Sequence, residues 1–339
     1  MKAYGIGDQS GIPGLHQYDA PDPVAGPGEI VVRVIAAGLN YRDLMVLRGG
    51  YGAAQPTVRV PLSDGVGVVE ALGDGVTQVK IGDRVVAPHF VNWAEGKFSM
   101  ALFGRDLGVT ADGWLAEKIV IPAAAAIKLP DGVSDATAAS LAVVGGTVWH
   151  AMVAFGKVQP GELVLAQGTG GVSIFALQLA KALGAQFAIT SSSDAKLGKC
   201  RAMGADFVVN YRDRPDWAAA LLEATSGRGA DVVVDTLGFP ALGETISACA
   251  TEARIGTLGA LSGTPQAQAT ASQGIIIAKN ITIKGIASGS RAMLAAALDV
   301  VASNRVEMVV DRSFAFDEVP AAYEHLQSGA HMGKVLIKL

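Results

Sequence analysis

A glycine-rich segment at 168–173 is the part of the sequence best suited to bind a charged ligand. It reads Gly168-Thr169-Gly170-Gly171-Val172-Ser173, after the apolar stretch ELVLAQG and at the start of the helical pattern VSIFALQLAKALG. The first glycine permits a tight turn, and Gly170 lets a pyrophosphate approach free N–H groups at the helix N-terminus. A strand, a glycine loop and a helix in this order predict a dinucleotide site, rather than a turn that binds nothing.

The end of the next expected strand, QFAITS at 186–191, indicates which dinucleotide binds. NAD-binding proteins place an Asp or Glu there to hold the ribose hydroxyls, whereas this chain has a run of serines followed by Lys196. Hydroxyls and an ammonium suit the 2′-phosphate of NADP(H). We therefore predict NADP(H), bound here by Ser191, Ser192, Lys196 and Tyr211. The alternative is that the serines cap the next helix and Lys196 is a solvated surface charge.

The elements that position this loop follow a regular alternation of strands and helices after about residue 131. Apolar strands are expected at 162–168, 186–191, 207–211, 231–236, 254–259 and 281–286. Near-continuous apolar strands separated by helices predict a parallel sheet that is covered on both faces. Six such strands match the doubly wound Rossmann fold.

The first 125 residues or so have a different pattern, with short strands and frequent turn signals. EIVVRVIAAG at 29–38 is rich in β-branched residues, and glycine pairs and Asp-Gly turns follow it closely. This spacing predicts a small β-barrel. The closing strand, GKVLIKL at 333–339, is expected to return to this domain. We predict a catalytic domain at 1–130, a dinucleotide-binding domain at 131–288 and a return to the catalytic domain at 289–339.

Composition excludes several classes of protein. The chain has 339 residues, 50% of them hydrophobic, and a net charge of −4 that provides no basic surface for nucleic acid. Two cysteines cannot form a disulfide framework, so a reducing cytoplasm is expected. The uncharged stretch 136–156 is long enough to span a membrane, but its glycines and His150 favour helices buried in the protein.

Taken together, this order of domains resembles the medium-chain dehydrogenase/reductase superfamily over essentially the whole chain. The features that carry the resemblance are the barrel-like first domain, the Rossmann unit opened by GTGGVS and the final strand HMGKVLIKL. AAGLNYRDLMVLRGGYG at 36–52 resembles the zinc-independent quinone oxidoreductase and enoyl reductase branches. The resemblance implies an α/β fold, with a Rossmann doubly wound parallel sheet and a β-rich GroES-like barrel domain.

The resemblance also implies that this chain lacks the metal of the alcohol dehydrogenases in the superfamily. Those enzymes hold a catalytic zinc with a Cys, a His-Glu pair and a later Cys or Asp. The first of these positions falls on Asn40 and the pair falls on Ser63 and Asp64. Zinc prefers thiolate and imidazole ligands, and the histidines are scattered, with His89 the one closest to the expected site. We therefore expect no metal.

Arg42 stands where alcohol-oxidising members carry a Ser or Thr that relays a proton. An arginine does not deprotonate in proteins and cannot replace that relay. It could bind a carbonyl oxygen, a carboxylate or a cofactor phosphate. A salt bridge with Asp43 or Asp64 is an equally good interpretation.

The remaining candidate residues are positions that match the family. Tyr51 lies eleven residues after Asn40, the spacing of the resembled branches, and is the candidate proton donor; the alternative is an apolar wall. Asn40 is expected to bind the substrate oxygen or the nicotinamide ribose. Thr147 matches a threonine beside the nicotinamide, and Gly259 and Ala260 match a loop that approaches the cofactor.

These residues together predict an NADPH-dependent reductase of quinones or α,β-unsaturated carbonyls. Without zinc, such acceptors need only a hydride from the cofactor and a proton from the protein. Two alternatives stay open: a zinc-free alcohol dehydrogenase or ketone reductase, and a crystallin-like NADPH-binding protein with little activity. The apolar strand at 281–286 would leave an exposed sheet edge, so we expect a homodimer formed through it.

Overall fold

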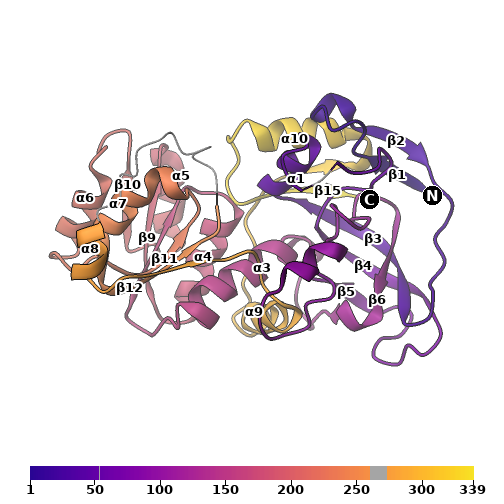
Figure 1. The fold of residues 1–339 in the computed structure, drawn as a ribbon, viewed down its shortest axis with the longest axis horizontal. Coiled ribbons are helices and arrows are strands. Elements are labelled where there is room, and N and C mark those ends of the chain that lie inside the picture. Colours follow the sequence, from indigo (N-terminus) through magenta and orange to yellow (C-terminus); the bar gives the residue numbers. More distant parts are fainter. Residues whose placement is uncertain (53, 260–272) are drawn as a thin grey trace. The chain divides into compact units, whose positions relative to one another are not determined.

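The computed structural model describes residues 1–52, 54–259 and 273–339, which form two compact units. The first unit comprises Met1–Gly146 and Ser290–Leu339, and the second comprises Thr147–Gly289. No helix within the described ranges is long and apolar enough to cross a membrane. Figure 1 shows the elements of both units, coloured along the chain.

The first unit is built on a seven-stranded sheet with the order β14-β15-β3-β4-β5-β7, in which β6 also pairs with β3. Its pairings are antiparallel except for β14 with β15. A separate two-stranded sheet pairs β1 with β2. The strands of the unit are β1 (Lys2–Gly5), β2 (His16–Asp19), β3 (Glu29–Leu39), β4 (Asp64–Leu72), β5 (Arg84–Val86), β6 (Lys118–Pro122), β7 (Ile127–Lys128), β14 (Val310–Ala315) and β15 (Lys334–Lys338). Its helices are α1 (Tyr41–Leu47), α2 (Asp135–Ala138), α9 (Arg291–Ser303) and α10 (Val319–Gln327), together with the start of α3 (Ala142–Trp149).

The second unit contains a six-stranded parallel sheet with the order β10-β9-β8-β11-β12-β13. This order reverses beside β8, as expected for a doubly wound Rossmann fold. The strands are β8 (Leu163–Gln167), β9 (Gln186–Ser191), β10 (Phe207–Asn210), β11 (Ala230–Asp235), β12 (Cys249–Thr257) and β13 (Thr282–Gly285). The helices are α4 (Gly171–Ala182), α5 (Asp194–Ala202), α6 (Trp217–Ala224), α7 (Leu242–Ser247) and α8 (Gln273–Ala278), and a π-helical turn covers His150–Phe155.

The fold class predicted from the sequence is confirmed. β8 is buried at every position, as a central parallel strand should be. The closing strand also returns as expected, since β15 pairs antiparallel with β3 in the first unit.

The boundary between the units lies later than the composition change at residue 131 indicates, because the chain passes from one unit to the other after Gly146. The segment between these points is held by the first unit. Glu307 accepts hydrogen bonds from the hydroxyls of Ser134 and Thr137, and the Val143 N–H donates to Asp64. A side chain added at Gly38 would lie 2.2 Å from the Ala139 carbonyl oxygen, so β3 and this segment are in direct backbone contact. These contacts are not visible as a composition signal in the sequence.

Candidate functional site

The first group of site residues forms where β3 ends and α1 begins. The pairing of β3 with β4 sets Gly38 opposite Asp64, and the pairing with β15 sets Leu39 opposite Val335. Asn40 is the N-cap of α1, and its backbone N–H donates to Oδ2 of Asp43 at 2.7 Å. This register brings the side chains of Asn40, Asp64 and Lys334 together.

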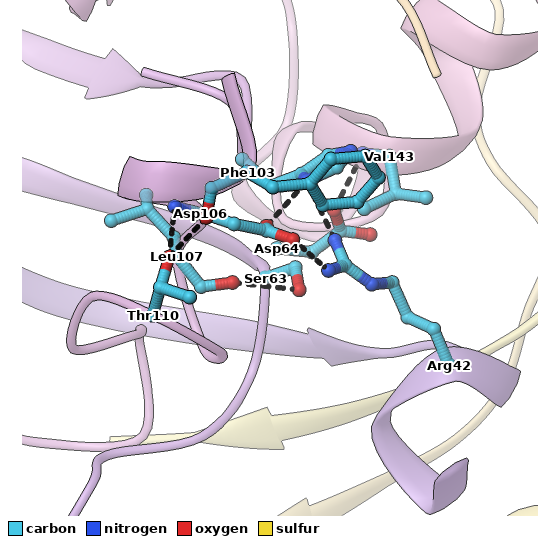
Figure 2. Close-up of polar contacts among 9 residues, drawn as sticks. Arg42, Ser63, Asp64, Phe103, Asp106, Leu107, Thr110 and Val143 are labelled. Atoms are coloured by element: carbon cyan, nitrogen blue, oxygen red, sulfur yellow. Dashed lines mark hydrogen bonds and ion pairs between the residues drawn. The ribbon is translucent and has the colours of Figure 1, made fainter. Parts of the chain in front are cut away.

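Lys334 lies at the centre of this group. Its Nζ donates to Oδ1 of Asn40 and to Oδ2 of Asp64, each at 2.8 Å. The Asn40 amide also donates to Oδ2 of Asp64 at 2.9 Å, and the Val143 N–H donates to Oδ1 at 2.6 Å (Figure 2). The side chains of Lys334 and Asp64 are 2% and 0% exposed. Such burial of two charges is tolerated because they are paired and hydrogen-bonded.

The residues at the positions of the zinc ligands do not fit zinc. The amide of Asn40 is engaged with Asp64 and Lys334, and the hydroxyl of Ser63 donates to the Leu107 carbonyl at 3.0 Å (Figure 2). The carboxylate of Asp64 is already paired with a positive charge, the ammonium of Lys334. Within 1–52, 54–259 and 273–339 there is no group of three or more His, Cys, Asp or Glu that could hold a metal.

A second buried group consists of Arg42, His89 and Asp106. Nη2 of Arg42 lies 2.6 Å from Oδ2 of Asp106 (Figure 2). The His89 Nδ1 lies 2.7 Å from Oδ1 of the same carboxylate. Their side chains are 10%, 2% and 0% exposed, in the order Arg42, His89, Asp106. Burial alone would raise the pKa of Asp106, but His89 and Arg42 hold that pKa below its usual value. Arg42 is therefore in a salt bridge, and its partner is Asp106 rather than Asp43 or Asp64.

His89 has one ring nitrogen in reach of both charged neighbours. Its Nδ1 lies 2.6 Å from Nη1 of Arg42, in addition to its contact with Asp106. A guanidinium only donates and a carboxylate only accepts, so Nδ1 serves one of these contacts at a time. Burial, reinforced by the charge of Arg42, lowers the pKa of His89. The ring is therefore neutral at neutral pH, and the trio carries one positive and one negative charge.

Tyr51 packs on the guanidinium of this trio. The Arg42 Cζ lies 4.7 Å from the centre of the Tyr51 ring, within the range of a cation–π contact. Burial raises the pKa of Tyr51, and the nearby positive charge of Arg42 opposes that rise only in part. The phenol therefore keeps its proton at neutral pH, and the guanidinium is placed to stabilise a phenolate.

The glycine loop of the second unit has the form that the sequence indicates. Gly168 follows β8 with a φ of 72°, and Gly170 is the N-cap of α4. A Cβ added to either glycine would meet no described atom within 4 Å, so both positions border open space. The buried hydroxyl of Thr147 has no hydrogen-bond partner in the described chain. These features fit a nicotinamide dinucleotide, with its pyrophosphate at the start of α4 near Thr169, Gly171 and Val172.

Gly259 is required for a reason internal to the protein. A Cβ at this position would lie 1.8 Å from the carbonyl oxygen of Thr236, so the loop after β12 lies directly on the end of β11. The packing of this loop alone therefore explains why residue 259 is a glycine. Ala260 lies outside the described residues.

The edge formed by the ends of β9 and β10 is polar. Ser191 is buried, and its hydroxyl accepts a hydrogen bond from the Ser193 N–H at 3.3 Å. Ser193 caps α5 through the Lys196 N–H, while Tyr211 is 43% exposed. One acid is also present, because Oδ1 of Asp194 accepts from the Asn210 amide at 2.9 Å. Ser193 thus caps α5, as the alternative interpretation expects, while the Ser191 hydroxyl bonds within the turn before that helix.

The comparisons with known proteins identify the family. Residues 26–131 match the family described as "Alcohol dehydrogenase GroES-like domain", and residues 171–303 match "Zinc-binding dehydrogenase". A zinc-type alcohol dehydrogenase-like protein of Schizosaccharomyces pombe is 37% identical over 95% of this chain and 94% of that protein. The chain belongs to the medium-chain dehydrogenase/reductase superfamily. It is therefore an oxidoreductase of a family that binds nicotinamide cofactors and acts on small molecules.

Relatives within the superfamily carry different descriptions. An acryloyl-coenzyme A reductase of Metallosphaera sedula is 31% identical over 96% of both chains. Among solved structures, an NAD-dependent alcohol dehydrogenase has a TM-score of 0.90 at 32% identity, covering 100% of both chains. A quinone oxidoreductase of Pseudomonas syringae has a TM-score of 0.83 at 28% identity, covering 100% of this chain and 99% of that one. Proteins described as an acryloyl-coenzyme A reductase, a quinone oxidoreductase and an alcohol dehydrogenase are thus all similar to this chain.

Two residues of the site, Asp106 and Lys334, were not among the candidates predicted from the sequence. Asp106 lies in a loop that matches no motif. Lys334 belongs to the closing strand, from which only the return of the chain to the first domain was predicted. For Lys334 a signal was available, since an antiparallel pairing of 334–338 with the end of β3 sets it beside Asn40. For Asp106 there was none, because a loop of irregular structure brings it to Arg42.

Proposed function

We propose that this protein is a zinc-independent, NADPH-dependent reductase of α,β-unsaturated carbonyls or quinones. The observation that carries the proposal is the ammonium of Lys334, which lies 2.8 Å from both Asn40 and Asp64. The family resemblance assigns zinc-ligand positions to these two residues. Without a Lewis acid, an alcohol hydroxyl is not activated for oxidation. Reduction of an activated double bond requires only a hydride, which NADPH supplies when bound, and a proton.

Tyr51 is the residue proposed to supply that proton. Its phenol stays protonated at neutral pH because burial raises its pKa. When the proton leaves, the negative charge forms next to the guanidinium of Arg42, which Asp106 holds in place. The role of Arg42 is therefore to stabilise the phenolate of Tyr51. Its two Nη atoms are directed at Asp106 and His89.

Asn40 is proposed to keep the corner between β3 and α1 in its active geometry. Its side chain is engaged at both ends, by the Lys334 ammonium at Oδ1 and by the Asp64 carboxylate at Nδ2. An amide held in this way positions the first turn of α1, which carries Arg42. Contact with the substrate oxygen or the nicotinamide ribose is the further role that the family resemblance implies.

The residues proposed to hold NADP(H) lie in the second unit. The start of α4 would bind the pyrophosphate, and the orphaned hydroxyl of Thr147 would bind near the nicotinamide. Ser191, Ser192, Lys196 and Tyr211 would bind the 2′-phosphate, with helix α5 contributing its N-terminal N–H groups. The buried thiols of Cys200 and Cys249 are both free, which supports a reducing compartment such as the cytoplasm.

We also propose a homodimer formed through β13. Within the described sheet β13 pairs only with β12, so its other edge carries unpaired backbone groups. Pairing with the β13 of a second copy would extend the sheet across a two-fold axis. Light scattering at micromolar concentration should give twice the mass of the chain, and a monomer would contradict the proposal.

An acceptor screen with NADPH tests the proposed reaction. Initial rates with a quinone, an enone and a saturated ketone should show turnover of the first two and little of the third. Elemental analysis of the same preparation should find no stoichiometric zinc. One bound zinc per chain, lost together with activity on chelation, would overturn the proposal. Tight NADPH binding without turnover of any acceptor would favour the low-activity alternative.

A further inference from the structure

In the proposed reaction Asp106 only holds Arg42 in place, and yet its carboxylate is completely buried beside that guanidinium. Its Oδ2 accepts from Arg42 and its Oδ1 lies against His89, while its backbone N–H donates to the hydroxyl of Thr110 at 2.9 Å. That hydroxyl in turn donates to the Phe103 carbonyl at 2.7 Å (Figure 2). The carboxylate is therefore fixed in place by both its side chain and its backbone.

The contacts of Asp106 decide what Arg42 can bind. A guanidinium recognises a carboxylate best through two parallel N–H groups. Here Nη2 of Arg42 is bonded to Asp106, Nη1 points at His89, and the ring of Tyr51 covers one face. A ligand carboxylate would find both Nη atoms engaged, with only Nε left without a partner among the described residues, and it would be repelled by the charge of Asp106. An uncharged carbonyl oxygen meets no such repulsion.

We propose that Asp106 is a specificity-determining residue, which neutralises Arg42 so that the site accepts uncharged carbonyl compounds and rejects free carboxylates. The inference rests on the proposed function, because it assumes that the acceptor lies beside Tyr51. It narrows the substrates to esters, thioesters, amides, enones or quinones. Unsaturated acids would then be substrates only in a form whose carboxyl group has been converted to such a neutral derivative.

A pair of matched ligands tests this directly by binding. The probes are trans-2-octenoate and its uncharged amide, titrated calorimetrically into the protein saturated with NADP⁺. The wild type should bind the amide at least about tenfold more tightly than the acid. Equal affinities, or a preference for the acid, would overturn the proposal without requiring any variant to fold.

Asp106→Asn is the variant that should change this preference. Asparagine keeps the shape of the side chain and an oxygen for Arg42, but it removes the negative charge that is paired with the guanidinium. Affinity for the acid should rise by about tenfold at low salt, and the gain should shrink as salt is added. The gain should be absent in the double variant Arg42→Met with Asp106→Asn. Asp112→Asn, which alters the Arg59–Asp112 pair outside this group, should leave the preference unchanged.

The outcomes separate this inference from the proposed function. A folded Asp106→Asn protein, checked by circular dichroism, that gains no affinity for the acid would contradict the role of Asp106. If no acceptor is reduced but the ligand preference changes as expected, the specificity role stands and the proposed reaction fails. If enones are reduced but the wild type does not bind the amide more tightly than the acid, the proposed reaction stands and the specificity role of Asp106 fails.

Discussion

The ammonium of Lys334 lies 2.8 Å from Oδ2 of Asp64, and both side chains are almost completely buried in the first unit. Removing one partner of a buried ion pair leaves an uncompensated charge, which costs about 3–5 kcal/mol. Lys334→Met should therefore lower the free energy of unfolding by about that amount in urea denaturation. Lys128→Met is the matched control, because Lys128 is 60% exposed in its pair with Asp83, and it should cost about 1 kcal/mol or less.

The double variant Lys334→Met with Asp64→Leu separates the charge effect from packing. It removes both charges, so its loss of stability should be smaller than that of Lys334→Met alone. A Lys334→Met protein as stable as the wild type would contradict a buried ion pair that is shielded from water.

Asp43 should make stability depend on pH in the neutral range. Burial raises its pKa to about 7, although Arg42 opposes that rise. The folded state therefore holds a proton that the unfolded state, with a pKa near 3.8, has released. Stability from this group is present at low pH and falls as pH rises toward 7, by up to about 1.4 kcal/mol per pH unit.

Replacing Asp43 with Asn removes this dependence. The difference in melting temperature between Asp43→Asn and the wild type should shift in favour of the variant from pH 5 to pH 7, and then level off. Asp83→Asn is the control, because hydrogen bonding to the Lys80 N–H holds the pKa of Asp83 below its usual value. Its difference from the wild type should be constant over that range. A constant difference for Asp43→Asn as well would mean that Asp43 is ionised throughout.

Cofactor preference should depend on the end of β9. Ser191→Asp places a negative charge where the 2′-phosphate is proposed to bind, and like charges near a surface cost about 1–4 kcal/mol before screening. The affinity for NADPH should fall by roughly one to two orders of magnitude while that for NADH holds or rises. Fluorescence titration with both cofactors measures this.

Three further variants show whether charge or helix capping is responsible for the preference for NADPH. Lys196→Ala should weaken NADPH alone, with less effect at high salt, whereas Lys199→Ala, on the same helix, should weaken neither cofactor. Ser193→Ala removes the cap of α5 and reports the capping contribution. If Ser191→Asp weakens both cofactors equally, Ser191 is only a structural cap. If the wild type binds NADH as tightly as NADPH, the proposed preference is wrong.

The sequence predicted the second unit more completely than the first, for a physical reason. Parallel strands that are buried on both faces have a strong apolar pattern, so β8 to β11 and β13 were found within about one residue of their observed bounds. β12 begins earlier than predicted, at Cys249 rather than at residue 254. The site residues of the first unit depend on strand register and on an irregular loop. Neither leaves a periodic signal, so Asp106 and the contacts of Lys334 became visible only in the structure. Arg42 was interpreted correctly as a possible ion-pair residue, but its partner lies 64 positions away.

Tyr51→Phe removes the proposed proton donor while keeping the ring on Arg42. The loss of a general acid should lower kcat for an enone by roughly 10²–10⁴-fold, with NADPH affinity unchanged. Tyr41→Phe, at an exposed position of α1, is the control and should keep full activity. Because burial raises the pKa of Tyr51, wild-type kcat should not fall between pH 7 and 9. A Tyr51→Phe enzyme with wild-type kcat would assign the proton to water.

The product formed from methyl vinyl ketone and NADPH tests the central claim most directly, because this acceptor offers both a double bond and a carbonyl to the same enzyme. The account predicts butanone as the product, formed with one NADPH consumed per molecule and with no allylic alcohol. Accumulation of the allylic alcohol would show that the carbonyl receives the hydride, and it would contradict the assignment as a reductase of activated double bonds.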